Sequence, residues 1–106
     1  MGLDVVILEV CTKELREFPE EIRLDFLDAE AKLRAGQKLS MPLSRPMPEI
    51  GPQVHELRFK DRAGIYRIIY VIKKKDAIYM VHAFTKKTTK TPNKNIELAK
   101  KRIRRL

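Results

Sequence analysis

The stretch that decides the fold is residues 55–86, HELRFKDRAGIYRIIYVIKKKDAIYMVHAFTK. It contains three runs rich in β-branched and aromatic residues, His55–Phe59, Ile65–Ile72 and Ala77–Phe84, a composition typical of strands. The connections between them, Lys60–Gly64 and Lys73–Asp76, are short enough for antiparallel hairpins. This stretch therefore predicts three neighbouring antiparallel strands.

The residues before this stretch predict a further strand and two helices. Leu3–Val10 is almost continuously apolar and predicts a buried strand, after which Thr12 can cap a helix. Apolar residues then recur at three- and four-residue steps, the spacing of an amphipathic helix, but Pro19 interrupts them. We therefore expect either two helices, at about 12–18 and 19–35, or one helix kinked at the proline.

The remaining segments complete the expected fold. Gly36 is expected to end the second helix, and residues 36–54 contain four prolines and predict an irregular connection. Thr91 followed by Pro92 predicts the cap and the first position of a last, basic helix. With the order β-α-α-β-β-β-α, we expect a single α+β domain over residues 1–106. Its four-stranded sheet is mostly antiparallel and is packed by helices on one face.

Composition excludes several classes of protein. The chain has 106 residues and a single cysteine, Cys11, which rules out an internal disulfide and is most simply a core residue. No apolar run approaches the roughly 20 residues that a membrane span needs, and the N-terminus lacks the basic region of a signal peptide, so we expect a cytoplasmic protein. The sequence shows no metal-ligand cluster, phosphate-binding glycine loop or Ser/His/Asp order, so we expect no metal and no cofactor.

The charge of the chain is distributed unevenly. The net charge is +9, yet residues 1–54 hold 10 acidic and 7 basic side chains, whereas residues 55–106 hold 4 acidic and 16 basic ones. Such an asymmetry predicts one strongly electropositive face, which favours a nucleic-acid partner. A solubilising surface, a membrane-surface patch or an acidic protein partner would leave the same composition.

Arg67 is the most informative single residue of the predicted sheet. Alternation places it on one face of its strand with Ile65 and Ile69, among apolar neighbours, where a charge is costly without a partner. Arg58, on the preceding strand, is expected to lie beside it across the hairpin. Together they can clamp an RNA phosphate. The alternative is a structural salt bridge from Arg67 to one of two carboxylates, Glu56 or Glu97.

A tract of lysines and threonines follows the last predicted strand. Residues 85–92, TKKTTKTP, hold Lys86, Lys87 and Lys90 with four hydroxyls, and they can collect phosphate oxygens without a glycine-rich loop. We also include Lys60, at the end of the first hairpin strand, among the predicted substrate-binding cations. The alternative interpretation of the tract is a solvated turn.

Histidines and tyrosines offer weaker candidates. By alternation His82 shares a face with Ile78, Met80 and Phe84, and a histidine can exchange protons at neutral pH, as RNA cleavage through the 2′-hydroxyl requires. A structural role is the alternative, and it is the stronger expectation for both His82 and His55. The tyrosines can stack on bases, but core packing is the stronger expectation for each of Tyr66, Tyr70 and Tyr79.

Three segments in this order resemble a known family. Glu56-Leu57-Arg58, then Ile65–Tyr70, then His82–Pro92 are similar to the HigB-like, phage-derived branch of the RelE/ParE toxin superfamily. The resemblance implies a RelE-like α+β fold and the toxin of a type II toxin–antitoxin pair. Such a toxin is typically a metal-independent endoribonuclease that cuts messenger RNA on the ribosome by 2′-hydroxyl attack on the scissile phosphate.

The resemblance also implies roles for individual residues. Arg67 matches an arginine that stabilises the scissile phosphate, with Arg58 as a second ligand, and Lys87, beside Lys86, falls where a basic residue assists the leaving group. Many relatives end in a catalytic tyrosine or histidine, whereas this chain ends in KRIRRL, so His82 is the candidate for proton transfer. The implied partners are messenger RNA, the ribosome and an antitoxin, expected to carry a helix-turn-helix domain.

Two other functions fit the same pattern. The superfamily also contains non-enzymatic toxins that inhibit DNA gyrase, and the shared scaffold does not separate them from the ribonucleases. A phage-derived nucleic-acid-binding domain without catalytic activity is the second alternative.

Overall fold

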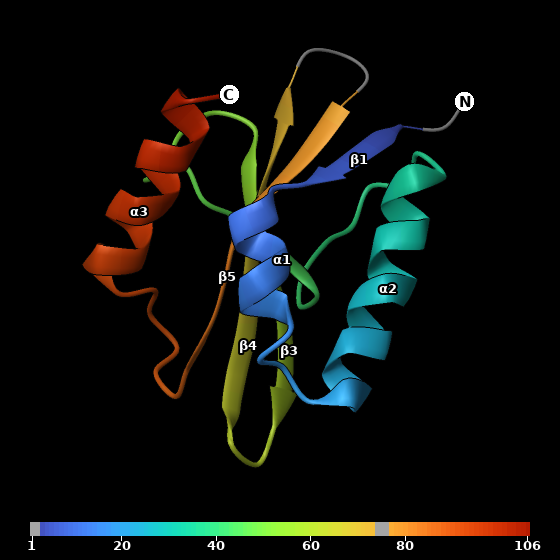
Figure 1. The fold of residues 1–106 in the computed structure, drawn as a ribbon, viewed down its shortest axis with the longest axis vertical. Coiled ribbons are helices and arrows are strands. Elements are labelled where there is room, and N and C mark those ends of the chain that lie inside the picture. The colour runs from blue at the N-terminus through green and yellow to red at the C-terminus, as the bar shows by residue number, and fades with distance from the viewer. Residues whose placement is uncertain (1–2, 74–76) are drawn as a thin grey trace.

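The computed structural model describes residues 3–73 and 77–106, and within them a five-stranded sheet is flanked by three helices (Figure 1). The sheet order is β1-β5-β4-β3-β2, with β1 parallel to β5 and all other neighbours antiparallel. The α+β class is therefore confirmed, with five strands in place of the expected four. The strands are β1 (Asp4–Ile7), β2 (Ser44–Pro46), β3 (Val54–Asp61), β4 (Gly64–Lys73) and β5 (Ala77–Lys86), and the helices are α1 (Glu9–Leu15), α2 (Glu20–Arg34) and α3 (Asn93–Arg104).

The additional strand, β2, comes from the proline-rich connection. Its three residues pair with β3, Ser44 opposite Leu57 and Pro46 opposite His55. A proline is tolerated there because β2 is an edge strand, so the missing N–H leaves no inner ladder position empty. The buried Ser44 hydroxyl lies 2.7 Å from the Tyr70 hydroxyl on β4, which ties this edge to the centre of the sheet.

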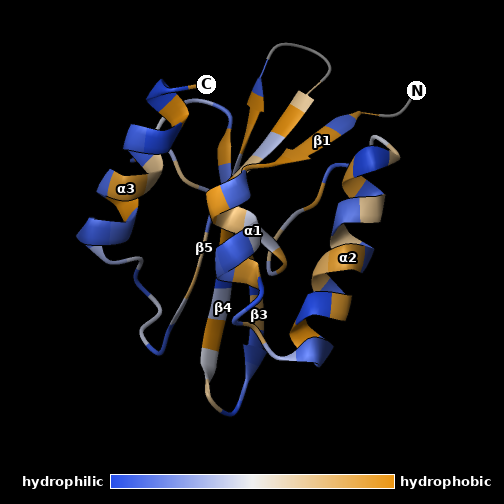
Figure 2. Cartoon of the chain, viewed as in Figure 1, coloured by the Kyte–Doolittle hydropathy of each residue, from blue (hydrophilic) through white to orange (hydrophobic). Residues whose placement is uncertain are grey.

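The helices cover both faces of the sheet, which corrects the expectation of one covered face. The larger core cluster joins α1 and α2 to one face, through side chains such as Phe26 and Ile68. The smaller cluster places Ala99 of α3 against the other face, with Ile69 and Val81. In Figure 1, α2 and α3 accordingly lie on opposite sides of the strands. Figure 2 shows that α3 is largely hydrophilic, with hydrophobic residues at intervals, because only a narrow stripe of it reaches the sheet.

The N-terminal elements differ from the prediction in their boundaries. The first strand ends at Ile7 rather than Val10, and α1 begins at Glu9 after Leu8, which caps it without a side-chain hydrogen bond. Thr12 is therefore not a cap but lies inside the first turn, where its N–H donates to the Leu8 carbonyl over 2.9 Å. The apolar run Leu3–Val10 contains all of β1 and the start of α1. It is almost continuous because α1, like β1, packs apolar side chains against the core.

The prediction of two helices is confirmed, and α2 lies close to the expected 19–35, but α1 ends at Leu15 rather than at residue 18. Pro19 is the residue that separates them, as the cap of α2. Gly36 follows the last turn of α2 with φ +85°, a backbone conformation that favours glycine. Its N–H donates to the Leu33 carbonyl and that of Gln37 to the Lys32 carbonyl, the pair of bonds that closes many helix ends.

One irregularity changes which residues share a face of β5. Ile69 of β4 is opposite His82, but the next residue, Tyr70, is opposite Met80, so Val81 is an extra residue on β5, a β-bulge. The bulge reverses the alternation. The prediction that His82 shares a face with Ile78 and Met80 is therefore wrong, although His82 and Phe84 remain neighbours on the α3 face.

The turn between β4 and β5 and the length of the helices were also predicted from the sequence. The predicted turn Lys73–Asp76 falls largely on residues 74–76, outside the described residues. Across residues 3–73 and 77–106, the helices are all too short or too polar to traverse a lipid bilayer.

Candidate phosphate-binding site

The predicted arginine pair lies on the sheet face that α3 partly covers. In the antiparallel pairing of β3 with β4, Arg58 is directly opposite Arg67, as the sequence predicts. The row before it places Glu56 opposite Ile69, and Arg45 of β2 opposite Glu56. Residues directly opposite one another point to the same face, so three arginines and one glutamate gather on one patch of the sheet.

Glu56 is the fully buried counter-charge of this patch. Its Oε1 accepts a hydrogen bond from Arg58 Nε at 2.9 Å, and its Oε2 accepts one from the Thr91 hydroxyl at 2.8 Å. Glu56 therefore makes no direct salt bridge with Arg67 within the described residues, and the Thr91 hydroxyl links the two side chains. The other carboxylate considered, Glu97, lies on α3, 3.3 Å from Lys100.

Arg67 is also fully buried, with a relative exposure of 0%. One terminal nitrogen donates to the Thr91 hydroxyl at 3.0 Å and the other to the Thr88 carbonyl. Its Nε–H, also buried, has no hydrogen-bond partner within residues 3–73 and 77–106. Burial lowers the pKa of the guanidinium; nearby Glu56 opposes this, and repulsion from the two other arginines adds to it. The group is charged at any physiological pH, so this environment holds a cation whose charge is not balanced.

The charge balance is the main chemical property of the patch. Three guanidinium groups face the single carboxylate of Glu56, and that carboxylate accepts its only arginine bond from Arg58. Arg67 is fully buried and the two other arginines are partly buried. This excess of positive charge, with an N–H donor left over, is unfavourable until an anion supplies the missing charge and acceptor. Arginine forks match phosphate oxygens in geometry, so the patch can bind a phosphate.

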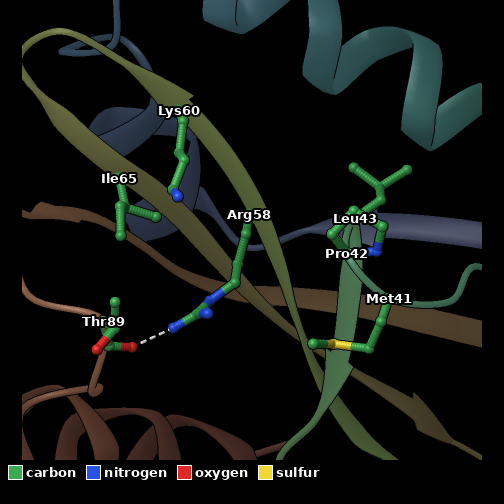
Figure 3. A pocket seen from close by; sticks show the side chains of 7 residues that line it. All are labelled: Met41, Pro42, Leu43, Arg58, Lys60, Ile65 and Thr89. Carbon is green, nitrogen blue, oxygen red and sulfur yellow. Dashed lines mark hydrogen bonds between the residues drawn. The ribbon is translucent and has the colours of Figure 1, made fainter.

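A pocket of about 370 Å³ opens beside the patch. Figure 3 shows Arg58 reaching across it to the Thr89 carbonyl, with Lys60 projecting from the neighbouring position of β3. Its remaining walls come from Ile65 and from the connection before β2. Two predicted substrate-binding residues, Arg58 and Lys60, are therefore brought together in a cavity of a size that suits a nucleotide.

The three other predicted lysines lie at the end of β5 and on the segment that follows it. Lys86 ends β5, opposite Ile65 of the pocket wall, and is half-buried. Lys87 and Lys90 are exposed on the segment that crosses over Arg67. Among the ion pairs found in residues 3–73 and 77–106, none involves these three lysines.

His82 occupies a separate, buried cluster. Its Nδ1 lies 3.1 Å from both carboxylate oxygens of Glu14, and its Nε2 accepts from the Asn95 amide at 2.8 Å. Its ring stacks on Phe84 with centroids 4.7 Å apart. Because both ring nitrogens are engaged and only 4% of the residue is exposed, His82 joins α1, β5 and α3 and does not line the pocket beside Arg58.

Glu14 holds this second cluster together. Besides His82, its carboxylate accepts from Arg102 of α3 at 2.8 Å and from the Ala83 N–H at 3.1 Å. Burial alone would raise the pKa of the Glu14 carboxyl, but these hydrogen bonds outweigh burial and hold the pKa at about 2. The carboxylate is therefore ionised throughout the physiological range.

The cysteine and two of the tyrosines are core residues, as expected, while Tyr79 is only partly buried against the smaller core cluster. Tyr70 is buried and stacks on His55 with centroids 5.3 Å apart. The buried Tyr66 donates its hydroxyl hydrogen to Asp61 at 3.0 Å. Cys11 is fully buried, and burial, reinforced by Glu14, raises the pKa of its thiol to about 12, so the thiol is unreactive.

Sequence reasoning missed two residues of the patch. Thr91 was expected to cap α3, but Pro92 is the capping residue and the Thr91 hydroxyl instead links Arg67 to Glu56. Arg45 lies in a segment expected to be irregular. Neither has a local signal, since both roles arise from contacts with residues more than ten positions away.

Comparisons with known proteins identify a family and a fold. The family model described as phage derived protein Gp49-like (DUF891) matches residues 13–104. A solved structure of a double arginine-to-alanine mutant of the Escherichia coli toxin RelE in the free state is similar in fold, with a TM-score of 0.65 and 15% sequence identity. The match covers 100% of this chain and 99% of that chain. The search of curated proteins finds no match. The chain therefore belongs to the phage-derived Gp49-like family and has the RelE fold, which confirms the resemblance to the phage-derived branch of the RelE/ParE superfamily.

Proposed function

We propose that this protein is the toxin of a type II toxin–antitoxin pair and that it is an endoribonuclease cleaving messenger RNA on the ribosome. The observation that carries the proposal is the patch in which three arginines share the one carboxylate of Glu56, with a buried Arg67 N–H unpartnered. A phosphodiester would supply both the missing charge and the missing acceptor. The family and the fold support the toxin class.

In this mechanism the RNA supplies its own nucleophile. The 2′-hydroxyl passes its proton to a water molecule and its oxygen attacks the adjacent phosphorus. The bond from phosphorus to the 5′-oxygen breaks, which gives a 2′,3′-cyclic phosphate and a 5′-hydroxyl. Negative charge increases on the phosphoryl oxygens in the transition state, where Arg58 and Arg67 stabilise it. Lys87 donates the proton to the leaving 5′-oxygen.

The remaining predicted residues bind the RNA or hold the fold around the site. Lys60, Lys86 and Lys90 pair with the phosphates on either side of the scissile one. Because His82 is buried in its own cluster, the proposal assigns it the positioning of α1, β5 and α3 rather than proton exchange with RNA. No step of the proposal uses a metal or a cofactor.

The proposed partners follow from the charge. An acidic or amphipathic antitoxin with a helix-turn-helix domain would cover the basic face and silence the toxin in the cytoplasm, where messenger RNA and ribosomes are its targets. The net charge of +9 favours both kinds of partner through long-range attraction.

The test is induced expression in a bacterial host with mapping of messenger RNA 5′ ends. The unchanged protein should arrest growth and create new cuts, and Arg67→Ala should reduce cutting by about a hundredfold or more. Lys87→Ala, at an exposed position, gives a second test that does not disturb the core. Arg62→Ala, in the exposed turn after β3, is the matched control and should cut normally.

Each contrary result has a definite meaning. Arrest with intact messages would overturn the ribonuclease and favour inhibition of DNA gyrase. Growth without arrest at equal expression would leave a binding domain without activity. Full cutting by Arg67→Ala would show that the catalytic phosphate binds elsewhere.

A further inference from the structure

The segment Lys87–Thr91, here called the strap, crosses directly over the two arginines. The Thr88 carbonyl accepts a hydrogen bond from Arg67. The Thr89 carbonyl accepts one from Arg58, which Figure 3 shows. These are the donors that a phosphate at this patch would need. In the free protein, two neutral backbone oxygens therefore occupy the places of two phosphate oxygens.

The strap is anchored at its C-terminal end. The Thr91 hydroxyl accepts from Arg67 at 3.0 Å and donates to Glu56 at 2.8 Å, and Thr91 is 2% exposed. By contrast, residues 87–90 are exposed. The strap is thus held by two inward carbonyls and one buried hydroxyl, while its lysines point to solvent.

This arrangement sets two opposing effects against each other. A charged phosphate makes stronger hydrogen bonds to guanidinium than a neutral carbonyl does, but the strap is part of the chain and is always present at high effective concentration. An isolated phosphate gains only the hydrogen bonds to Arg58 and Arg67 that the strap carbonyls give up. A run of phosphates also pairs with Lys87 and Lys90, so it gains additional contacts by drawing the strap outward.

We propose that the strap closes the phosphate site in the free protein and opens for a run of RNA phosphates rather than for an isolated one. The inference rests on the proposed role of Arg58 and Arg67 in phosphate binding and concerns the regulation of that site. It makes the protein selective for polymeric RNA over mononucleotides, and it explains how Arg67 can be fully buried and still meet a substrate.

The test weakens the anchor and measures binding of RNA of two lengths. The probes are fluorescently labelled 2′-O-methyl RNAs, a dinucleotide and a 12-nucleotide strand, which bind without being cleaved. Thr91→Val removes both hydroxyl bonds at nearly constant volume, and Thr91→Ser keeps the hydroxyl. Thr85→Val, at an exposed position of β5 opposite Tyr66 and outside the strap, is the matched control.

Weakening the anchor raises the fraction of the protein in which the strap is open, and both RNA lengths bind that form. Loss of the anchor should therefore raise the affinity for the dinucleotide and for the longer strand by the same factor, about five- to tenfold, the equivalent of one or two hydrogen bonds. The longer strand should stay the tighter ligand, because it also pairs with Lys87 and Lys90. Trypsin should cut after Lys87 and Lys90 faster in Thr91→Val than in wild type. Thr91→Ser and Thr85→Val should behave as wild type in both assays.

Thr89→Gly provides a variant that is safe for folding. It loosens the strap through backbone entropy without touching the core, so it should shift both assays in the direction of Thr91→Val even if that variant fails to fold. Equal weakening of both RNA lengths in Thr91→Val, or no change in either length, would overturn the strap as a gate.

The strap and the ribonuclease can fail separately. Binding of uncleavable RNA and proteolysis of the free protein both report on the strap without any catalytic turnover. A positive result here with intact messages in the cell would keep the gated phosphate site and reject the ribonuclease. The reverse pair of results would keep the ribonuclease and reject the gate.

Discussion

At the scale of single residues, two carboxylates that accept hydrogen bonds from arginines, the half-buried Glu14 and the fully buried Glu56, have different tasks. Glu14 holds three elements together through His82, Arg102 and the Ala83 N–H. Glu56 instead partly neutralises a patch with too many cations. Each carboxylate therefore makes its own prediction.

Glu14 should make stability depend on acid. Because the folded-state pKa, about 2, lies below the ordinary 4.5, its stabilisation is complete above about pH 4.5 and is lost as the pH falls through about 2. At neutral pH, Glu14→Gln should lower the free energy of unfolding by about 1–3 kcal/mol, and the difference from wild type should shrink between pH 4.5 and 2. Denaturant titrations at both ends of this range measure it.

The control for that series is Glu17→Gln, on an exposed residue just after α1. It should leave stability almost unchanged at every pH, since exposed charges contribute little. A gap between Glu14→Gln and wild type that stays constant down to about pH 2 would contradict the role of the ionised carboxylate.

Glu56 should make stability depend on anions. Glu56→Gln removes the carboxylate of the patch. The free energy of unfolding should therefore fall by about 3 kcal/mol, the usual order for breaking a buried ion pair. Inorganic phosphate should restore part of this loss and raise the melting temperature of the variant more than that of wild type, because it binds only the folded patch.

The comparison for Glu56→Gln uses chloride at equal ionic strength and Glu49→Gln on the exposed connection before β3. Equal effects of phosphate and chloride on Glu56→Gln would show that the patch has no specific anion site.

At the scale of elements, α3 depends on polar contacts as much as on apolar ones. Apart from the buried Ile96 and Ala99, it is joined to the sheet by Asn95, which donates to His82, and by Arg102, which donates to the Val81 carbonyl at 2.9 Å. A helix so hydrophilic (Figure 2) has little hydrophobic burial to compensate for the loss of one of these bonds.

Asn95→Ala should therefore destabilise the attachment of α3. It leaves His82 Nε2 buried without a donor, which costs about 1–3 kcal/mol. Amide protons of α3 should therefore exchange with solvent faster in the variant than in wild type, whereas those of β4 should exchange as before. Asn93→Ala, two residues earlier and exposed, carries the same change and should be close to neutral. Unchanged exchange in α3 would show that Asn95 does not hold the helix.

The elements also show how far the sequence alone can predict this fold. The alternation in β4 correctly separates Ile68 and Tyr70 from Ile69 and Val71, because a strand buried on both faces packs each set into a different core. The bulge at Val81 has no such local signal. It depends on how β5 meets β4, and so the face of His82 was predicted wrongly.

The site also has a part that local sequence patterns predict and a part that they do not. The pairing of Arg58 with Arg67 is local to one hairpin and was predictable from its length. Their burial under Thr88 and Thr91 was not, because the path of the strap is set by hydrogen bonds between segments some twenty to thirty-five residues apart. Sequence patterns describe elements well and the contacts between distant loops poorly.

At the scale of the whole molecule, the uneven charge should govern RNA binding. The seven cations assigned to RNA or to the patch are Arg45, Arg58, Lys60, Arg67, Lys86, Lys87 and Lys90. If about five of them contact phosphates, the logarithm of the binding constant for the 12-nucleotide RNA should fall against the logarithm of salt concentration with a slope of about −3.5. Fluorescence anisotropy over a series of potassium chloride concentrations measures this slope.

Lys90→Gln should make that slope shallower by about 0.7, the share of one phosphate contact on a single strand. Lys38→Gln, on the connection before β2, neutralises a lysine outside the patch and should leave the slope unchanged. An unaltered slope in Lys90→Gln would remove that lysine from the RNA-binding surface.

The parallel pairing of β1 with β5 has a consequence for synthesis of the chain. Because β1 lies at the edge of the sheet beside β5, the first strand made must wait for residues 77–80 before its partner exists. Arg67 likewise waits for Thr88 and Thr91. A nascent chain still lacking these residues holds the arginines but not the folded arrangement around them. Under the proposed function, completion of the toxin is thereby delayed until translation has passed the strap, and a ribosome making it is not confronted with a finished toxin partway through the message.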